Sequence, residues 1–191
     1  MITLVIVDCQ NDFITGTMSV KSARNSVEEI KKFIKNHKQE IEKIIFTVDW
    51  HPYDHCSFKK YGGEWVQHCI QFTPGACIEP KLLKYVQSFN IPYQVSTRGE
   101  DKYVDVNGPF EEIEFYQDDS LVSKYYFDSI VEADAGTEFV ITGVANATSI
   151  AIKNMMDNEI VPKVFCPGII STDGGRTFSE FIKEYNIEKT V

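Results

Sequence analysis

Short apolar runs of strand length recur along the chain and alternate with stretches of helical periodicity. The strand-length runs are residues 4–7, 44–48, 93–96, 121–123, 139–142 and 161–165. Between them, apolar residues recur every three or four positions, which predicts amphipathic helices. One predicted helix follows the capping-box pattern Ser26–Glu29, a second spans 147–156, and a third has its stripe at Phe178, Phe181, Ile182 and Tyr185.

Strands that alternate with helices in this way predict an α/β fold. We expect a single domain over residues 1–191, with an open, mostly parallel sheet and helices on both faces. Residues 94–117 are the least regular part, because Arg98-Gly99-Glu100-Asp101 and Asn107-Gly108-Pro109 are typical turn sequences. We interpret this segment as a surface excursion over a cleft.

Composition narrows the range of partners. The formal net charge is −9 at pH 7 and no basic run offsets it, so nucleic acid and anionic membranes are poor partners. The N-terminal apolar run lacks the basic leader of a signal peptide, and no run approaches the ~20 apolar residues that span a bilayer. The five cysteines are an odd number without a disulfide-framework spacing, which favours a reducing, cytoplasmic setting.

Three of the four histidines fall close together, beside an aspartate at the end of a predicted strand. His51 and His55 come two and six residues after Asp49, and His68 follows in the same stretch of sequence. A carboxylate and imidazoles at this spacing can close around one divalent metal ion. We expect Asp49, His51 and His68 as ligands, with His55, Glu64 or water in a fourth place. Zinc suits the mixed donor set best, and iron(II) or manganese is the alternative.

A second acidic pair follows the first predicted strand. Asp8 and Asp12 lie in the sequence Val7-Asp8-Cys9-Gln10-Asn11-Asp12-Phe13. Open parallel sheets bind ligands beyond the carboxyl ends of their strands, and Asp8 and Asp49 both occupy such ends. The pattern therefore predicts a shared cleft, although a turn or capping residue explains Asp12 equally well.

Three blocks of sequence resemble a known family over most of the chain. They are IVDCQNDF at residues 6–13, TVDWHP at 47–52 with its continuation to TPGA at 73–76, and VITGVANATS at 140–149. With these blocks the chain resembles the nicotinamidases of the isochorismatase-like cysteine hydrolase superfamily. The resemblance implies a Rossmann-like three-layer fold and a small-molecule substrate. It also implies homo-oligomers, since family members often assemble.

The family's reaction uses an aspartate base, a lysine that stabilises charge, and a cysteine thiolate that attacks an amide carbonyl. The resemblance maps the base to Asp8 and the nucleophile to Ser149, so serine stands where the family has cysteine. Lys124, at a strand end shortly before the nucleophile strand, is the favoured cation. Arg98 is the alternative, since Arg98-Gly99 matches a Lys-Gly form found in nicotinamidases. Backbone N–H groups around Ala145 and Ser149 are expected to form the oxyanion site.

Ser149 leaves several interpretations open. A hydroxyl is far harder to ionise than a thiol, so the exchange is expected to slow amide hydrolysis by several orders of magnitude. The serine is then an introduced change, part of a serine-based or nucleophile-free reaction, or the mark of a homologue without turnover. If the serine was introduced, the natural protein converts nicotinamide to nicotinate and ammonia. If the reaction needs no thiol, the function is isochorismatase-type hydrolysis of another substrate. If turnover is lost, the function is binding of a nicotinamide-like or nucleotide-derived ligand.

The resemblance also places the substrate. The metal is expected to bind the ring nitrogen of a nicotinamide-like ligand and to orient its carboxamide toward residue 149. Phe13 and Trp65 are expected to form the aromatic walls on either side of that ring, and Ala145 to contact the substrate.

Overall fold

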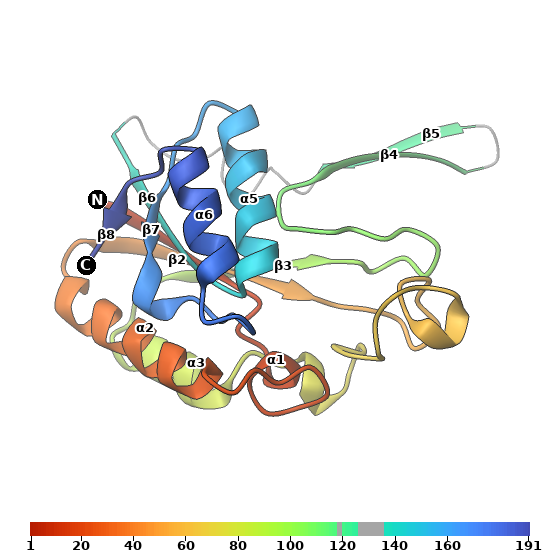
Figure 1. Ribbon diagram of the computed structural model, residues 1–191, viewed down its shortest axis with the longest axis horizontal. Coiled ribbons are helices and arrows are strands. Elements are labelled where there is room, and N and C mark those ends of the chain that lie inside the picture. Colours follow the sequence, from red (N-terminus) through yellow and green to blue (C-terminus); the bar gives the residue numbers. More distant parts are fainter. Residues whose placement is uncertain (118–119, 126–135) are drawn as a thin grey trace.

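The computed structural model describes residues 1–117, 120–125 and 136–191, with the backbone alone over 112–117 and 120–125 (Figure 1). The core of the fold is a six-stranded sheet in the order β3-β2-β1-β6-β7-β8, and all its paired strands run parallel. The strands are β1 (Ile2–Val7), β2 (Ile41–Asp49), β3 (Tyr93–Arg98), β6 (Glu138–Gly143), β7 (Lys163–Phe165) and β8 (Lys189–Thr190). The predicted open parallel sheet is therefore confirmed.

Helices cover both faces of the sheet, as the alternating pattern predicts. The helices are α1 (Asn11–Ile14), α2 (Ala23–His37), α3 (Pro80–Ser88), α5 (Ala145–Asp157) and α6 (Arg176–Glu184). In the central strand β1, Leu4 and Ile6 face the core beneath α2 and α3, while Val5 and Val7 face the core beneath α5 and α6. A strand buried on both faces reads as a continuous apolar run, which explains the sequence of β1.

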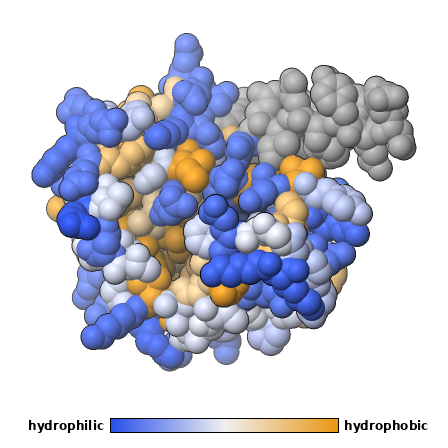
Figure 2. Space-filling view, turned by 45° about the vertical axis from the view of Figure 1, so that its right-hand side comes forward, coloured by the Kyte–Doolittle hydropathy of each residue, from blue (hydrophilic) through white to orange (hydrophobic). Residues whose placement is uncertain are grey.

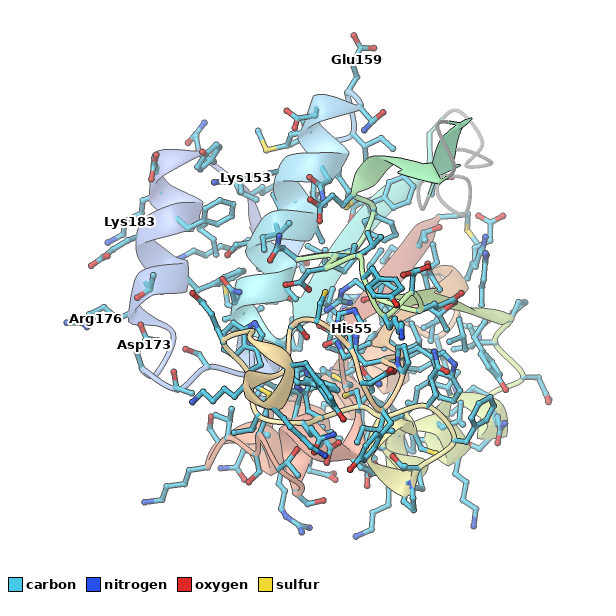
Figure 3. All side chains as sticks on the ribbon, turned by 90° about the vertical axis from the view of Figure 1, so that its right-hand side faces the viewer. His55, Lys153, Glu159, Asp173, Arg176 and Lys183 are labelled. Carbon is cyan, nitrogen blue, oxygen red and sulfur yellow. The ribbon has the colours of Figure 1, made fainter. Side chains whose placement is uncertain are left out.

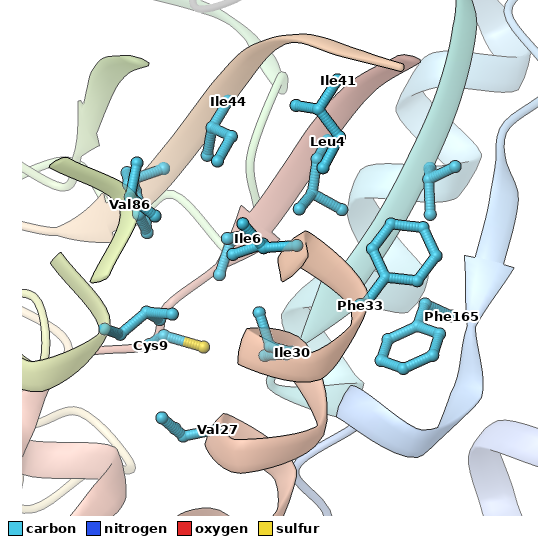
Figure 4. Close-up of a cluster of buried hydrophobic side chains, with 14 of the residues drawn as sticks. Leu4, Ile6, Cys9, Val27, Ile30, Phe33, Ile41, Ile44, Val86 and Phe165 are labelled. Carbon is cyan, nitrogen blue, oxygen red and sulfur yellow. The ribbon is translucent and has the colours of Figure 1, made fainter. Parts of the chain in front are cut away.

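The larger core joins the sheet to α2 and α3. Figure 4 shows Ile30 and Phe33 of α2 directed at Leu4 and Ile6 of the sheet, with Phe165 beside Phe33. The rings of Phe33 and Phe165 lie 4.6 Å apart. Outside this core the face shown in Figure 2 is largely hydrophilic, with apolar side chains in separate patches. Within the described residues, none of the helices combines the length and apolar character that a bilayer crossing requires.

The first long helix begins earlier than the capping-box pattern predicts. Helix α2 starts at Ala23, and Ser26 lies inside it as a buried residue. The Ser26 hydroxyl donates to the carbonyl of Ile169 at 2.9 Å, so it ties the helix to the loop after β7 and caps nothing. Ser26 joins the helix to a loop that is distant in sequence, and a local sequence pattern does not predict such a contact.

One predicted strand lies outside the main sheet. Residues 121–123 fall in β5 (Ser120–Tyr125), which pairs antiparallel with β4 (Glu112–Gln117) as a separate two-stranded sheet. Figure 1 shows this hairpin projecting from the body of the molecule.

The prediction of a surface excursion over 94–117 is only partly right. This segment includes most of β3 and the strand β4. Arg98, Val106 and Phe110 within it are buried, and Phe110 packs into the core beneath α5. The asparagine amide of Asn154 on α5 donates to the carbonyl of Pro109 at 2.9 Å, so the segment is anchored to that helix.

Candidate metal centre and active site

The site lies at the carboxyl edge of the sheet, where β1, β2, β3 and β6 end. Strand β1 ends at Val7, opposite Thr47 of β2 and Gly143 of β6, so Asp8 is the first residue beyond it. Asp49 is the last residue of β2 and pairs in register with Arg98, the last residue of β3. Parallel pairing thus gathers side chains far apart in sequence at one edge, where such sheets bind ligands.

Gln10 holds the end of β2 in place after β1 has ended. Its side-chain amide donates to the carbonyl of Asp49 at 2.7 Å and accepts from the N–H of Asp49 at 2.8 Å. It also donates to the carbonyl of Ala76 at 2.8 Å. The Gln10 amide therefore replaces the peptide group that β1 would have offered to Asp49. The sequence gives no hint of this role, because glutamine is usually an exposed residue.

Asp49, His51 and His68 come together as a buried cluster. One potential ligand atom from each lies within 4.8 Å of the others. The Nε2 atoms of His51 and His68 lie 3.7 Å and 3.6 Å from the two carboxylate oxygens of Asp49. The rings of Phe58 and His68 lie 5.5 Å apart, and those of Phe58 and His51 are equally close at 5.5 Å, so Phe58 packs against both imidazoles.

The hydrogen bonds of the two imidazoles suit metal binding. His51 Nδ1 lies 3.1 Å from the carbonyl of Gly99, and His68 Nδ1 lies 2.8 Å from the carbonyl of Val66. A carbonyl can only accept, so each Nδ1 carries a proton, and each Nε2 faces Asp49, where it can ligate an ion once it carries no proton of its own. Metal-binding histidines in proteins are usually held in this way. The donor chemistry of the three residues therefore fits a divalent metal ion.

His55 does not join this cluster, contrary to the prediction. Its Nδ1 lies 2.7 Å from the hydroxyl of Ser57 and its Nε2 lies 3.1 Å from the carbonyl of Val104. Both ring nitrogens are therefore engaged elsewhere, although the His51 and His55 rings stack at 4.3 Å. Figure 3 shows His55 in the interior of the molecule, and burial lowers its pKa. Glu64, the other candidate ligand, is exposed.

Asp8 makes its strongest contacts with Arg98. The guanidinium donates from Nη1 to one Asp8 oxygen and from Nη2 to the other, both at 2.6 Å. The same Nη2 lies 2.7 Å from the nearer oxygen of Asp49. Arg98 is buried with both carboxylates, so one cation serves two acids. Asp8 itself has a φ of 55°, a left-handed conformation that is uncommon outside glycine.

Burial and the shared cation move the two aspartates in opposite directions. Burial raises the pKa of Asp8, and the neighbouring Asp49 carboxylate adds to this, while Arg98 opposes both. Burial also works to raise the pKa of Asp49, but Arg98 and the nearby imidazoles of His51 and His68 more than offset it, so that this pKa is lowered. Burial works to lower the pKa of His68, but Asp49 and the Val66 carbonyl have the larger effect, so the pKa of His68 is raised.

Asp12 fixes the loop that carries His68. Its carboxylate accepts the backbone N–H of Cys69 at 2.7 Å and that of Thr17 at 3.2 Å. This is a structural role in the turn after β1, one of the interpretations of Asp12 that the sequence left open. Phe13 is buried, and its ring lies 5.6 Å from that of His68, while its role as a substrate wall stays a prediction.

The nucleophile position lies at the start of the helix that follows β6. Ser149 is partly buried in the second turn of α5, and its hydroxyl donates to the carbonyl of Ala145 at 3.0 Å. The N–H of Ala145 donates to the carbonyl of Ile170 at 2.9 Å, so it is not available for the oxyanion site that we expected there. The thiols of Cys9 and Cys69 are buried, and burial raises the pKa of both, so neither is a ready nucleophile.

The two candidate cations differ in what the structure shows. Arg98, the alternative, contacts Asp8 directly. Lys124, the favoured one, lies on β5, where the side chains are outside the described residues, so its role stays a prediction. Trp65 is 43% exposed and forms a bridge with Phe58 through the backbone, so its role as a substrate wall also stays a prediction.

The chain is similar to known proteins in sequence and in fold. Residues 3–91 match the family model described as the isochorismatase domain. The nicotinamidase of Escherichia coli strain K12 is 32% identical over 95 residues, which cover 41% of this chain and 45% of that protein. The chain matches about half the length of the nicotinamidases of Escherichia coli and Saccharomyces cerevisiae.

Solved structures extend the likeness of fold over the whole chain. The yeast nicotinamidase has a TM-score of 0.80 at 20% identity, and the alignment covers 100% of this chain and 99% of the other. A pyrazinamidase of Pyrococcus horikoshii, solved in complex with zinc, has a TM-score of 0.76 at 21% identity, with 99% and 98% covered.

Proposed function

Because residues 3–91 match the isochorismatase domain, we propose that the chain is a metal-dependent hydrolase of the nicotinamidase type. The substrate is a small carboxamide such as nicotinamide, which is converted to nicotinate and ammonia. The observation that carries the proposal is the buried cluster of Asp49, His51 and His68 beside Asp8 at the carboxyl edge of the sheet. The names of the relatives and the zinc complex of the Pyrococcus protein support it.

Asp49, His51 and His68 would hold the metal, and zinc fits two imidazoles and a carboxylate best. When bound, the ion would supply a Lewis-acidic anchor for the ring nitrogen of the ligand. Phe13 lies against His68 and would pack on the ring that the site holds.

Asp8 and Ser149 would perform the proton transfer and the attack. In the structure both Asp8 oxygens accept N–H groups of Arg98, and the Ser149 hydroxyl donates to Ala145. Neither group is therefore poised for the reaction, and turnover requires Asp8 to accept the proton of residue 149. We expect slow hydrolysis, since the base is engaged and a hydroxyl is a poor nucleophile without a strong base.

Ammonia release from nicotinamide tests the proposal. Ser149→Cys restores a thiol at the nucleophile position, so we expect it to increase the rate by at least about tenfold. Ser149→Ala removes the nucleophile and Ser88→Cys adds a thiol on the exposed end of α3, and both serve as controls. No release by either the wild-type chain or Ser149→Cys would exclude a nicotinamidase.

A second function has a specific observation in its favour. The bidentate Asp8–Arg98 pair and the serine at position 149 fit a protein that binds a nicotinamide-like or nucleotide-derived ligand without cleaving it. Calorimetry with nicotinamide, nicotinate and the related nucleotides tests this directly. We expect saturable binding that His51→Ala abolishes. Absence of saturable binding to the wild-type chain would eliminate the binding function.

A further inference from the structure

Arg98 connects the general-base position to the metal cluster. It is the last residue of β3 and is 5% exposed. Its Nη2 donates to Asp8 at 2.6 Å and also lies 2.7 Å from Asp49, on the carboxylate that faces both histidines. The two contacts place one fixed positive charge between two buried acids.

The guanidinium of Arg98 makes its contacts with Asp8 and Asp49 through its terminal nitrogens. Its two terminal nitrogens contact carboxylates, while the buried Nε has no hydrogen-bond partner among the described residues. An unpaired buried donor costs free energy, so the charge contacts must outweigh that cost. A lysine would be a single point charge on a flexible stem, whereas arginine is a planar fork that can hold two acids at once.

A divalent ion and Arg98 would interact with the same Asp49 carboxylate. A zinc–oxygen bond is about 2.0–2.2 Å long, so an ion on Asp49 would stand close to the guanidinium. Two cations at this distance repel one another strongly in a buried site. Arg98 therefore opposes metal binding, and in the metal-free protein it offsets the charge of Asp8 and Asp49.

We propose that Arg98 is a built-in counter-cation that keeps the centre folded without metal and weakens its affinity for a divalent ion. Metal loading at Asp49, His51 and His68 is then reversible and is governed by the supply of metal. The inference rests on the metal site of the proposed function, and on nothing about the amide reaction. Arg98 is a positioning residue in this account, because it acts on the metal through Asp49.

Two substitutions with opposite expected effects separate this role from simple bracing. Arg98→Gln removes the opposing charge, so zinc should bind about tenfold more tightly or better. Asp8→Asn leaves Arg98 to Asp49 alone, so zinc should bind about tenfold more weakly. If Arg98 only braced the site, its removal would disorder Asp49 and weaken the binding of zinc.

The measurement is competition for Zn²⁺ with a chromophoric chelator, together with thermal unfolding with and without Zn²⁺. Arg176→Gln is the matched control, because Arg176 is exposed on α6 and points away from the body in Figure 3. It should leave the zinc affinity unchanged. Arg98→Gln should lower the unfolding temperature of the metal-free protein and enlarge the increase that zinc produces.

Unchanged or weaker zinc binding by Arg98→Gln would overturn the proposal. If Arg98→Gln fails to fold without metal, the zinc affinity of Asp8→Asn tests the proposal instead. Unchanged or tighter zinc binding by Asp8→Asn would also refute the proposal. A wild-type chain that binds no zinc refutes both this proposal and the metal site. Zinc affinities that change as expected, in a protein that releases no ammonia, would refute the hydrolase and leave the proposal standing.

Discussion

Replacement of Gln10 by methionine tests whether a side-chain amide really completes the sheet at the metal site. The two side chains have similar length, but methionine offers no hydrogen bonds. The change leaves three buried backbone groups without their present partners, namely the N–H and C=O of Asp49 and the C=O of Ala76. Each unpaired buried group costs about 1–3 kcal/mol, so the free energy of unfolding should fall by at least about 3 kcal/mol.

Urea unfolding of the metal-free protein measures this loss. Gln87→Met is the matched control, since Gln87 is exposed and its amide contacts only the hydroxyl of Tyr93 among the bonds described. The control should change stability by no more than about 0.5 kcal/mol. Gln10→Met should also bind zinc at least about tenfold more weakly, because Asp49 loses its support. A loss of stability below about 1 kcal/mol would refute the reasoning.

Two further substitutions probe the frame around the site. Gly143→Ala should lower the free energy of unfolding by at least about 2 kcal/mol in urea titrations, because Gly143 has a φ of 128° and an added Cβ would overlap the carbonyl oxygen of Val7. Hydrogen bonds from Ser171 and Thr177 hold the pKa of Asp173 below its ordinary value of 3.8. The ionised carboxylate therefore stabilises the folded state above pH 3.8. This stabilisation is lost as the pH falls through the lower pKa of the folded state. Asp173→Ala should therefore lower the unfolding temperature at pH 7, and the difference from wild type should shrink as the pH falls well below 3.8; a constant difference would contradict this assignment.

The layers of the fold could be predicted because they depend on local patterns. The apolar runs of β1, β2 and β6 are buried on both faces, and the stripe of α2 faces one core. The beginning of α2 was placed wrongly, since Ser26 bonds to the distant Ile169 and caps nothing. The strand β8 and the helix α3 are not predicted, because β8 has only two residues and α3 repeats its buried apolar position only once, at Leu82 and Val86.

The candidate site divides in the same way. Asp49, His51 and His68 could be grouped because they are near in sequence and Asp49 ends a predicted strand. The pairing of Asp8 with Arg98 spans 90 positions, and only the parallel register of β1, β2 and β3 brings the two together.

His55 shows that sequence spacing alone can suggest a metal ligand whose ring nitrogens bond elsewhere. It has the right spacing for a ligand, and its ring stacks on that of His51. Its nitrogens nevertheless bond to Ser57 and to Val104, which lies 49 residues away. A contact at that separation is set by the path of the loop after β3, which a local pattern does not encode.

Metal content is the most direct test of the account. The wild-type chain, brought to equilibrium with Zn²⁺ by dialysis, should hold about one zinc per chain in excess of the dialysate, measured by inductively coupled plasma mass spectrometry. His51→Ala and His68→Ala should each lose it, while His55→Ala should keep it. A wild-type chain without bound metal, or retention of zinc by both ligand variants, would contradict the central claim.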